Sequence, residues 1–339
     1  MRMTVTVQQR RPRYLGAATG LLLLGSAGTA CFRTPLEDSM PPGPMPDSGV
    51  YRSDVAHRAD LALDLIPVGE TGVGAFVSVS SGGFHTCGVR TDGAIACWGS
   101  NSVGQATPPA GAFRSVSAGD LHTCALRTDD TVACWGDNLD AYGDFAGEAT
   151  PPAGAFVSVS SGGGHTCGLK TDSTIACWGY NGDGQAAPPA GTFSSVSAGG
   201  FHTCGLRTDA TIACWGEGLY RITAPPAGIF SSVSDGWNHA CGLKTDHTIV
   251  CWGLNLVGEA TPPAGTFASV SAGENHTCGV STDGTIACWG DSEFGQATPP
   301  AGAFYSVSAG AWHTCGLKTD GTVTCWGDNT YGQATPPPT

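Results

Sequence analysis

Histidine, threonine and aspartate recur together in this chain, and these are residue types that can do chemistry. His85 is followed by Thr86, and Asp92 lies seven residues further on; the same group returns in six later copies, once with Ala in place of Thr. An imidazole, a hydroxyl and a carboxylate are the parts of a nucleophilic triad. An enzyme, however, needs one asymmetric constellation, and this group repeats almost unchanged. We therefore predict that the chain is not an enzyme and that each His is a buried scaffold residue held by a backbone carbonyl.

Cysteine is the second reactive residue type, and its spacing is equally regular. Fourteen of the fifteen cysteines form seven pairs with a spacing of ten residues: Cys87 and Cys97, Cys124 and Cys134, Cys167 and Cys177, Cys204 and Cys214, Cys241 and Cys251, Cys278 and Cys288, and Cys315 and Cys325. If each pair lies cross-strand in a hairpin of an exported protein, disulfides are expected. Buried free thiols are one alternative. Zinc held by His85, Cys87 and Cys97 is another, but this spacing matches no usual zinc pattern, so we expect no metal and no cofactor.

The elements that carry these residues are short strands. Residues 76–80 alternate with a period of two, residues 85–90 and 94–98 suggest two more strands, and Thr91-Asp92-Gly93 suggests a three-residue turn between them. This register places Cys87 opposite Cys97. The tail after each Trp-Gly is rich in turn residues and leaves room for at most a short fourth strand.

The strands belong to a unit that is written seven times. The seven His residues are 37 residues apart except for one step of 43, and the copies run over 74–110, 111–153, 154–190, 191–227, 228–264, 265–301 and 302–338. Three or four short antiparallel strands cannot bury both of their faces alone, but neighbouring copies stacked around a ring can do so. We predict an all-β, seven-bladed β-propeller in which the strand rich in small residues is innermost. An open array is the alternative, disfavoured because neither end copy resembles a polar cap.

The repeat also resembles a known family. The run SAGAWHTCGLKTDGTVTCWGDNTYGQ, residues 308–333, shows the unit most cleanly. It resembles the repeat of the regulator of chromosome condensation family, and it is similar to the compact bacterial members in its short length. The resemblance implies a seven-bladed propeller. It does not imply a particular partner, because one fold serves many functions.

The N-terminal 73 residues predict export. A basic head with Arg2 and Arg13 precedes the apolar stretch 15–24, which is too short to span a membrane, and small residues lead to Cys31. We predict a signal peptide over 1–30, lipidation of Cys31, and a Pro-rich tether over 31–73. The expected location is the bacterial cell envelope, or the medium if Cys31 is not lipidated, as after an ordinary signal peptide cut near Ala30.

Charge excludes one class of partner. The chain has 15 basic and 28 acidic residues, for a formal net charge of −13, and Arg2, Arg10, Arg11 and Arg13 fall within the export signal. The acidic remainder repels nucleic-acid phosphates and anionic lipid. We therefore expect no nucleic-acid partner, and contact with a membrane only through the lipid anchor.

The positions that differ between copies predict where a partner binds. The two residues before each His vary in size and charge while their flanks stay nearly constant. In a closed ring these positions share one rim, and the candidate partner-binding residues there are Phe84, Asp120, Leu121, Phe201, Trp237, Glu274 and Trp312. The Trp that follows the second Cys of each copy is expected to pack between blades instead. We predict a non-catalytic, surface-tethered, monomeric protein-binding propeller of unknown partner; a carbohydrate- or envelope-polymer-binding propeller is the alternative.

Overall fold

The computed structural model describes residues 74–139 and 146–338. The predicted signal peptide, Cys31 and the tether therefore lie outside the described residues. Within the described residues, no helix is both long enough and apolar enough to cross a membrane.

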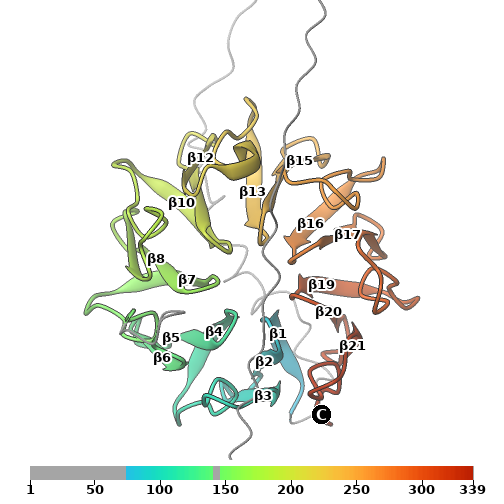
Figure 1. Ribbon diagram of the computed structural model, residues 1–339. Coiled ribbons are helices and arrows are strands. Elements are labelled where there is room, and N and C mark those ends of the chain that lie inside the picture. The colour runs from blue at the N-terminus through green and yellow to red at the C-terminus, as the bar shows by residue number, and fades with distance from the viewer. Residues whose placement is uncertain (1–73, 140–145, 339) are drawn as a thin grey trace, which may run out of the picture. The chain divides into compact units, whose positions relative to one another are not determined.

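Seven three-stranded antiparallel sheets are arranged around a central axis, and each sheet is one continuous copy of the repeat (Figure 1). The seven-bladed, all-β propeller predicted from the sequence is confirmed, with three strands per blade among the described residues. The innermost strands are β1 (Phe76–Ser81), β4 (Phe113–Ala118), β7 (Phe156–Ser161), β10 (Phe193–Ala198), β13 (Phe230–Asp235), β16 (Phe267–Ala272) and β19 (Phe304–Ala309).

The middle strands begin at the repeated His, and the outer strands carry the repeated Cys-Trp-Gly. The middle strands are β2 (His85–Arg90), β5 (His122–Arg127), β8 (His165–Lys170), β11 (His202–Arg207), β14 (His239–Lys244), β17 (His276–Ser281) and β20 (His313–Lys318). The outer strands are β3 (Ile95–Gly99), β6 (Val132–Gly136), β9 (Ile175–Gly179), β12 (Ile212–Gly216), β15 (Ile249–Gly253), β18 (Ile286–Gly290) and β21 (Val323–Gly327).

The register of the hairpin agrees with the prediction. Cys87 on β2 is paired with Cys97 on β3, and the two sulfurs form a disulfide. All seven Cys pairs are disulfides, with Cα–Cα separations of 4.0–4.1 Å, which is the close approach of a pair of residues that do not hydrogen-bond to each other in an antiparallel ladder. Neither free thiols nor a zinc site at these cysteines agrees with this bonding.

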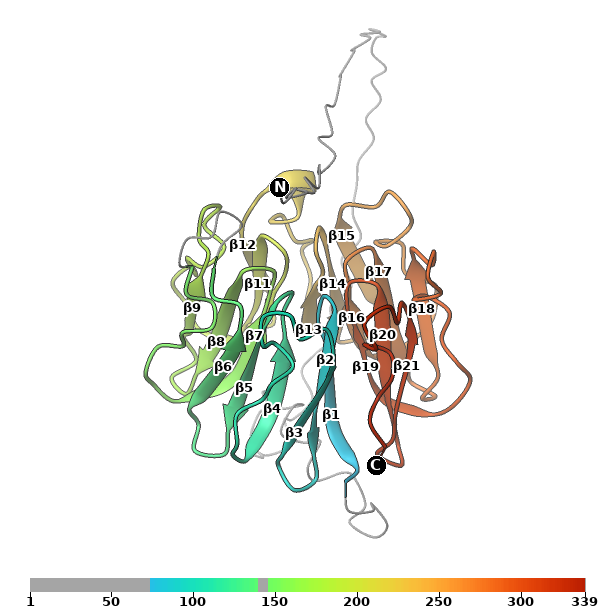
Figure 2. The ribbon, with the colours of Figure 1, turned by 60° about the horizontal axis from the view of Figure 1, so that its bottom comes forward.

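The blades stand side by side and hold one another near the axis (Figure 2). The hydroxyl of Ser80 accepts a hydrogen bond from the backbone N–H of Ala118 in the next blade, at 3.0 Å. The last blade closes on the first in the same way, because the hydroxyl of Ser308 accepts from the N–H of Ser81 at 2.8 Å. The ring therefore closes by the same contact that joins its interior seams, with no strand exchanged between the first and last copies.

Candidate functional site

The repeated His, Thr and Trp residues join neighbouring blades. His85 Nε2 lies 2.7 Å from Thr123 Oγ1, and the Thr123 hydroxyl donates to the backbone carbonyl of Gln105 at 2.9 Å. Since the one hydroxyl proton is used on that carbonyl, His85 must be the donor to Thr123. The same His-to-Thr contact of 2.7 Å is present at six of the seven seams, at His85–Thr123, His122–Thr166, His165–Thr203, His239–Thr277, His276–Thr314 and His313–Thr86.

This arrangement corrects one expectation and supports another. The predicted partner of each His, a backbone carbonyl, is wrong: the imidazole meets a threonine hydroxyl, and the hydroxyl meets the carbonyl. Burial lowers the pKa of His85 to about 3 and that of His122 to about 4, so these imidazoles are neutral near pH 7. A buried neutral His whose N–H is already engaged has no access to a substrate.

The repeated Trp residues are also scaffold, as predicted. Trp135 donates its indole N–H to the carbonyl of Gln105, the same carbonyl that receives Thr123. Trp98 is 9% exposed and packs edge-on against Phe76, with ring centroids 5.9 Å apart. The hydrogen bonds and ring contacts of these indoles lie within the scaffold, so the indoles do not form a platform for sugar rings.

A pocket opens on the propeller axis, and it is the place where the differing residues of the seven copies meet. About 420 Å³ of space free of protein atoms, part of it open to solvent, lies at the ends of the innermost strands. The position two residues before each His contributes to its lining in every blade, through Gly83, Asp120, Gly163, Gly200, Trp237, Glu274 and Ala311. Three of the predicted partner-binding residues, Asp120, Trp237 and Glu274, therefore face one pocket.

Glycines bring the chain close to the axis below this ring of variable residues. A Cβ on Gly82 would lie 2.3 Å from the carbonyl oxygen of Gly119 in the next blade, and one on Gly236 would lie 2.3 Å from that of Gly273. No side chain fits at these positions, so the glycines keep the inner end of the pocket narrow. The residue before each glycine also lines the pocket and is Ser or Ala in six blades and Asp235 in the fifth.

The pocket has an acidic character. Burial is the main cause that raises the pKa of Glu274 to about 7, and the negative charges of Asp120 and Asp291 add to the effect. No Lys or Arg is among the residues that line the pocket. The lining therefore gains negative charge as the pH rises through 7.

The other four predicted residues, Phe84, Leu121, Phe201 and Trp312, lie outside the pocket lining. Three of them form edge-on aromatic pairs on the same face. Phe201 contacts Trp237 across the seam between the fourth and fifth blades, with centroids 5.7 Å apart. Phe84 pairs with Tyr331 at 5.8 Å and Trp312 with Phe294 at 5.5 Å, so the variable loop after Trp-Gly reaches the same surface. Phe201, Phe294 and Tyr331 are 37%, 48% and 56% exposed.

One cluster was not among the predicted sites. His202, Asp235 and Cys204 lie together in the seam between the fourth and fifth blades, where Ala240 takes the place of the usual Thr. The sequence shows two departures from the repeat in the fifth copy, Asp235 and Ala240. Only the folded ring shows that both lie opposite His202 of the fourth blade.

Similarity to known proteins agrees with this architecture. The sequence pattern described as Regulator of chromosome condensation (RCC1) repeat matches residues 76–105, 113–143, 156–185, 193–220, 230–259, 267–296 and 304–333, which together exceed half of the chain. The fold and the contacts between neighbouring blades define a seven-bladed propeller with one repeat per blade. The chain belongs to the RCC1 repeat family.

Solved structures show the same fold. The ectodomain of the receptor kinase CR4 from Physcomitrella patens is 28% identical, with a TM-score of 0.63, covering 75% of this chain and 74% of that one. The CRINKLY ectodomain of the Arabidopsis thaliana receptor kinase ACR4 is 27% identical, with a TM-score of 0.61, covering 75% and 98%. Prp20p from Saccharomyces cerevisiae, at 16% identity and a TM-score of 0.59, covering 69% and 80%, shares the fold. Among curated protein sequences, none matches this chain significantly.

Proposed function

We propose that this chain is an exported, non-catalytic module that binds another protein on the propeller face that holds the axial pocket. The observation that carries the proposal is the convergence of seven variable positions on one pocket within an otherwise uniform ring. Selection of a partner needs differences between blades, and these differences are gathered at the pocket and on the aromatic pairs around it.

The chemistry of the pocket favours a basic group on the partner. Asp120 and Glu274 supply negative charge, and the ring of Trp237 in the same lining offers a face for a cation. A lysine or arginine side chain projecting from a partner's loop fits this combination. The partially exposed rings of Phe201, Phe294 and Tyr331 then provide apolar contact area around it.

The location of the module is part of the proposal. Seven disulfides suit an oxidising compartment, and the two structures with 27% and 28% identity are receptor ectodomains. We place the propeller outside the cytoplasm as a monomer, tethered by a lipid on Cys31. Membrane fractionation tests the tether: Cys31→Ser should release the protein into the soluble fraction without changing its thermal unfolding, and a wild-type protein that is already soluble and unacylated would remove this part of the proposal.

Site-specific photo-crosslinking in the envelope of the source organism tests the binding face. A photoreactive residue at Phe201 should capture a protein, whereas the same residue at His247, on the exposed hairpin turn at the other end of the blade, should not. Trp237→Ala should reduce capture at Phe201 at least tenfold while Asp92→Ala leaves it unchanged. Capture at His247 alone would place the interface on the opposite face, and capture of a glycan polymer at Phe201 would favour the carbohydrate-binding alternative.

The pH dependence of capture tests the basic-group chemistry. Glu274 gains its charge as the pH rises through about 7, so affinity for a cationic side chain should increase between pH 6 and pH 8. Glu274→Gln should remove that increase. An affinity that falls over this range in the wild-type protein would contradict a basic group in the pocket.

A further inference from the structure

One seam between neighbouring blades differs from the other six in three residues. The fifth blade has Ala240 where the other blades have Thr, and Asp235 where they have Ser or Ala. The loop that feeds this seam has Ile222 where the other copies have Gln or Glu, and the Ile222 carbonyl receives only the Trp252 indole. Three departures from a sevenfold pattern therefore coincide at the seam between the fourth and fifth blades.

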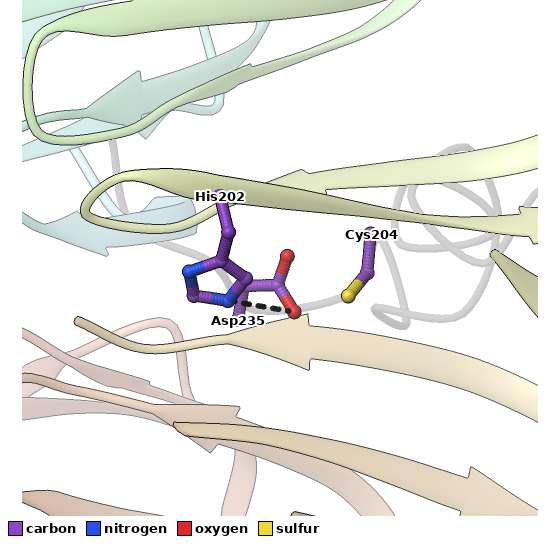
Figure 3. A group of neighbouring side chains, drawn as sticks. All are labelled: His202, Cys204 and Asp235. Carbon is purple, nitrogen blue, oxygen red and sulfur yellow. Dashed lines mark ion pairs between the residues drawn. The ribbon is translucent and has the colours of Figure 1, made fainter. Parts of the chain in front are cut away.

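The missing hydroxyl is replaced by a carboxylate. His202 on β11 and Asp235 on β13 point toward each other across the seam, with Nε2 and Oδ1 3.7 Å apart (Figure 3). Both side chains are almost completely buried, at 2% and 0% exposure. At this separation the contact is an ion pair and not a hydrogen bond, and neither His202 Nε2 nor the two Asp235 oxygens makes a hydrogen bond of ordinary length. The backbone N–H of Cys204 also acts on the Asp235 carboxylate and favours its charged form. Within the described structure, His202 is the ion-pair partner of the buried Asp235 carboxylate.

Few other ionisable groups act on this pair. His165 on β8 and His239 on β14 are buried neighbours, and burial, together with the charge of His202, lowers the pKa of each to about 3, so both stay neutral. Glu217, in the loop after β12, is the remaining charged group that interacts with His202. Burial also raises the pKa of Asp235. An unpaired carboxylate at this depth is strongly disfavoured.

Cys204 Sγ lies in the same cluster, with its ligand atom within 4.8 Å of the other two. That sulfur is bonded to Cys214, so a metal ion would find only His202 and Asp235 as protein ligands. A stable zinc site in proteins takes three or four such ligands. The arrangement therefore suits a proton better than a metal.

We propose that His202 and Asp235 share one proton in the folded protein, which makes this seam weaken as the pH rises above neutral. The other six seams behave in the opposite way, because their neutral His–Thr contacts favour higher pH. The proton-sharing seam also carries the Phe201–Trp237 pair on its outer face.

The sign of the effect follows from counting protons. In the unfolded chain an Asp loses its proton near pH 3.8, and a His does so near pH 6.5, so above about pH 6.5 the unfolded pair holds no proton. The folded pair keeps one, because its loss would leave the Asp235 carboxylate buried without a counter-charge. The folded state binds more protons than the unfolded state in this range, and stability falls as the pH rises.

Restoring the common seam tests this. Asp235→Ala combined with Ala240→Thr recreates the His–Thr contact of the other six seams. Urea unfolding of the full-length protein, with disulfides intact, is compared for this double variant and the wild type from pH 5.5 to 8.5. Above pH 6.5 the wild-type unfolding constant should rise relative to that of the double variant by up to tenfold per pH unit. The titration of Glu274 contributes equally to both proteins and therefore does not affect this comparison. Parallel pH dependences would overturn the proposal.

The reverse exchange provides a second test that does not require the first variant to fold. Ala198→Asp with Thr203→Ala, in the seam to His165, should create a second seam that weakens above neutral pH. A variant in which this seam gains no such dependence contradicts the proposal. Zinc is the remaining control: stabilisation of the wild type by micromolar zinc, absent from Asp235→Ala with Ala240→Thr, would show a metal site in place of proton sharing.

Discussion

At the scale of single residues, threonine explains more of this protein than its modest chemistry suggests. Thr123 receives the N–H of His85 from one blade and donates to the Gln105 carbonyl, so one hydroxyl satisfies two buried polar groups. A repeated His is noticeable in a sequence because it is rare and reactive. The repeated Thr beside it is what makes that His structural.

Removal of one such hydroxyl should therefore cost stability. Thr123→Val keeps the shape of the side chain but leaves the N–H of His85 buried without an acceptor, and we expect the free energy of unfolding to fall by about 1–3 kcal/mol. Thr128→Val, on the exposed hairpin turn, should change it by less than ~0.5 kcal/mol. Urea unfolding measures both. Equal effects of the two substitutions would argue against the interblade role of Thr123.

At the scale of elements, strand pairing in the hairpin determines the backbone conformation of the turn, even where the residue at that position disfavours it. Arg90 and Ala94 enclose a three-residue loop, with Gly93 at φ +81°. Asp130, Ser173, Ala210 and His247 stand at the same position in other blades with φ of 65–70°. The left-handed conformation that Gly adopts freely is thus imposed on side chains that disfavour it, because the paired strands and their disulfide determine the turn.

Glycine should therefore stabilise the turns that lack it. We expect Ala210→Gly to raise the free energy of unfolding by about 0.5–1 kcal/mol, since relief of the left-handed strain exceeds the added entropy of the unfolded chain. Gly93→Ala should lower it by a similar amount. Chemical denaturation of the two variants beside the wild type checks the opposite signs. A loss of stability with Ala210→Gly would show that the loop is not strained.

At the scale of the whole molecule, six buried imidazoles make the ring sensitive to acid. Burial lowers the pKa of His85, His165, His239 and His276 to about 3 and that of His122 and His313 to about 4. An unfolded His binds a proton near pH 6.5. Below that value the unfolded state takes up protons that these six folded seams exclude, so each of the six loses stability as the pH falls.

The resulting acid unfolding should be steep. Each of the six His residues can contribute up to about 1.4 kcal/mol of lost stability per pH unit below pH 6.5. Circular dichroism during urea titration between pH 4.5 and pH 7.5 measures this slope. Thr123→Val should not make the slope shallower, since His85 stays buried and neutral. A stability that is constant across this range would mean that the imidazoles are charged in the folded protein.

The sequence by itself determined the β class, the seven blades, the strand positions and the pairing of the cysteines. These features are set by patterns that repeat within one copy: the period of two, the turn residues between strands, and two Cys at equal distances from Asp92. The scaffold role of His and Trp also followed from repetition. Such properties depend on residues close together along the chain, so they can be predicted from the sequence.

Contacts between copies were decided only by the tertiary structure. The hydroxyl partner of His85 lies 38 residues away, and the convergence of Asp120, Trp237 and Glu274 on one pocket joins three different blades. The departures at Asp235 and Ala240 acquired a meaning only when His202 was placed opposite them. A repeat specifies how each blade folds, but which side chains meet across a seam depends on the twist and closure of the ring, and these arise from the packing of all seven blades together.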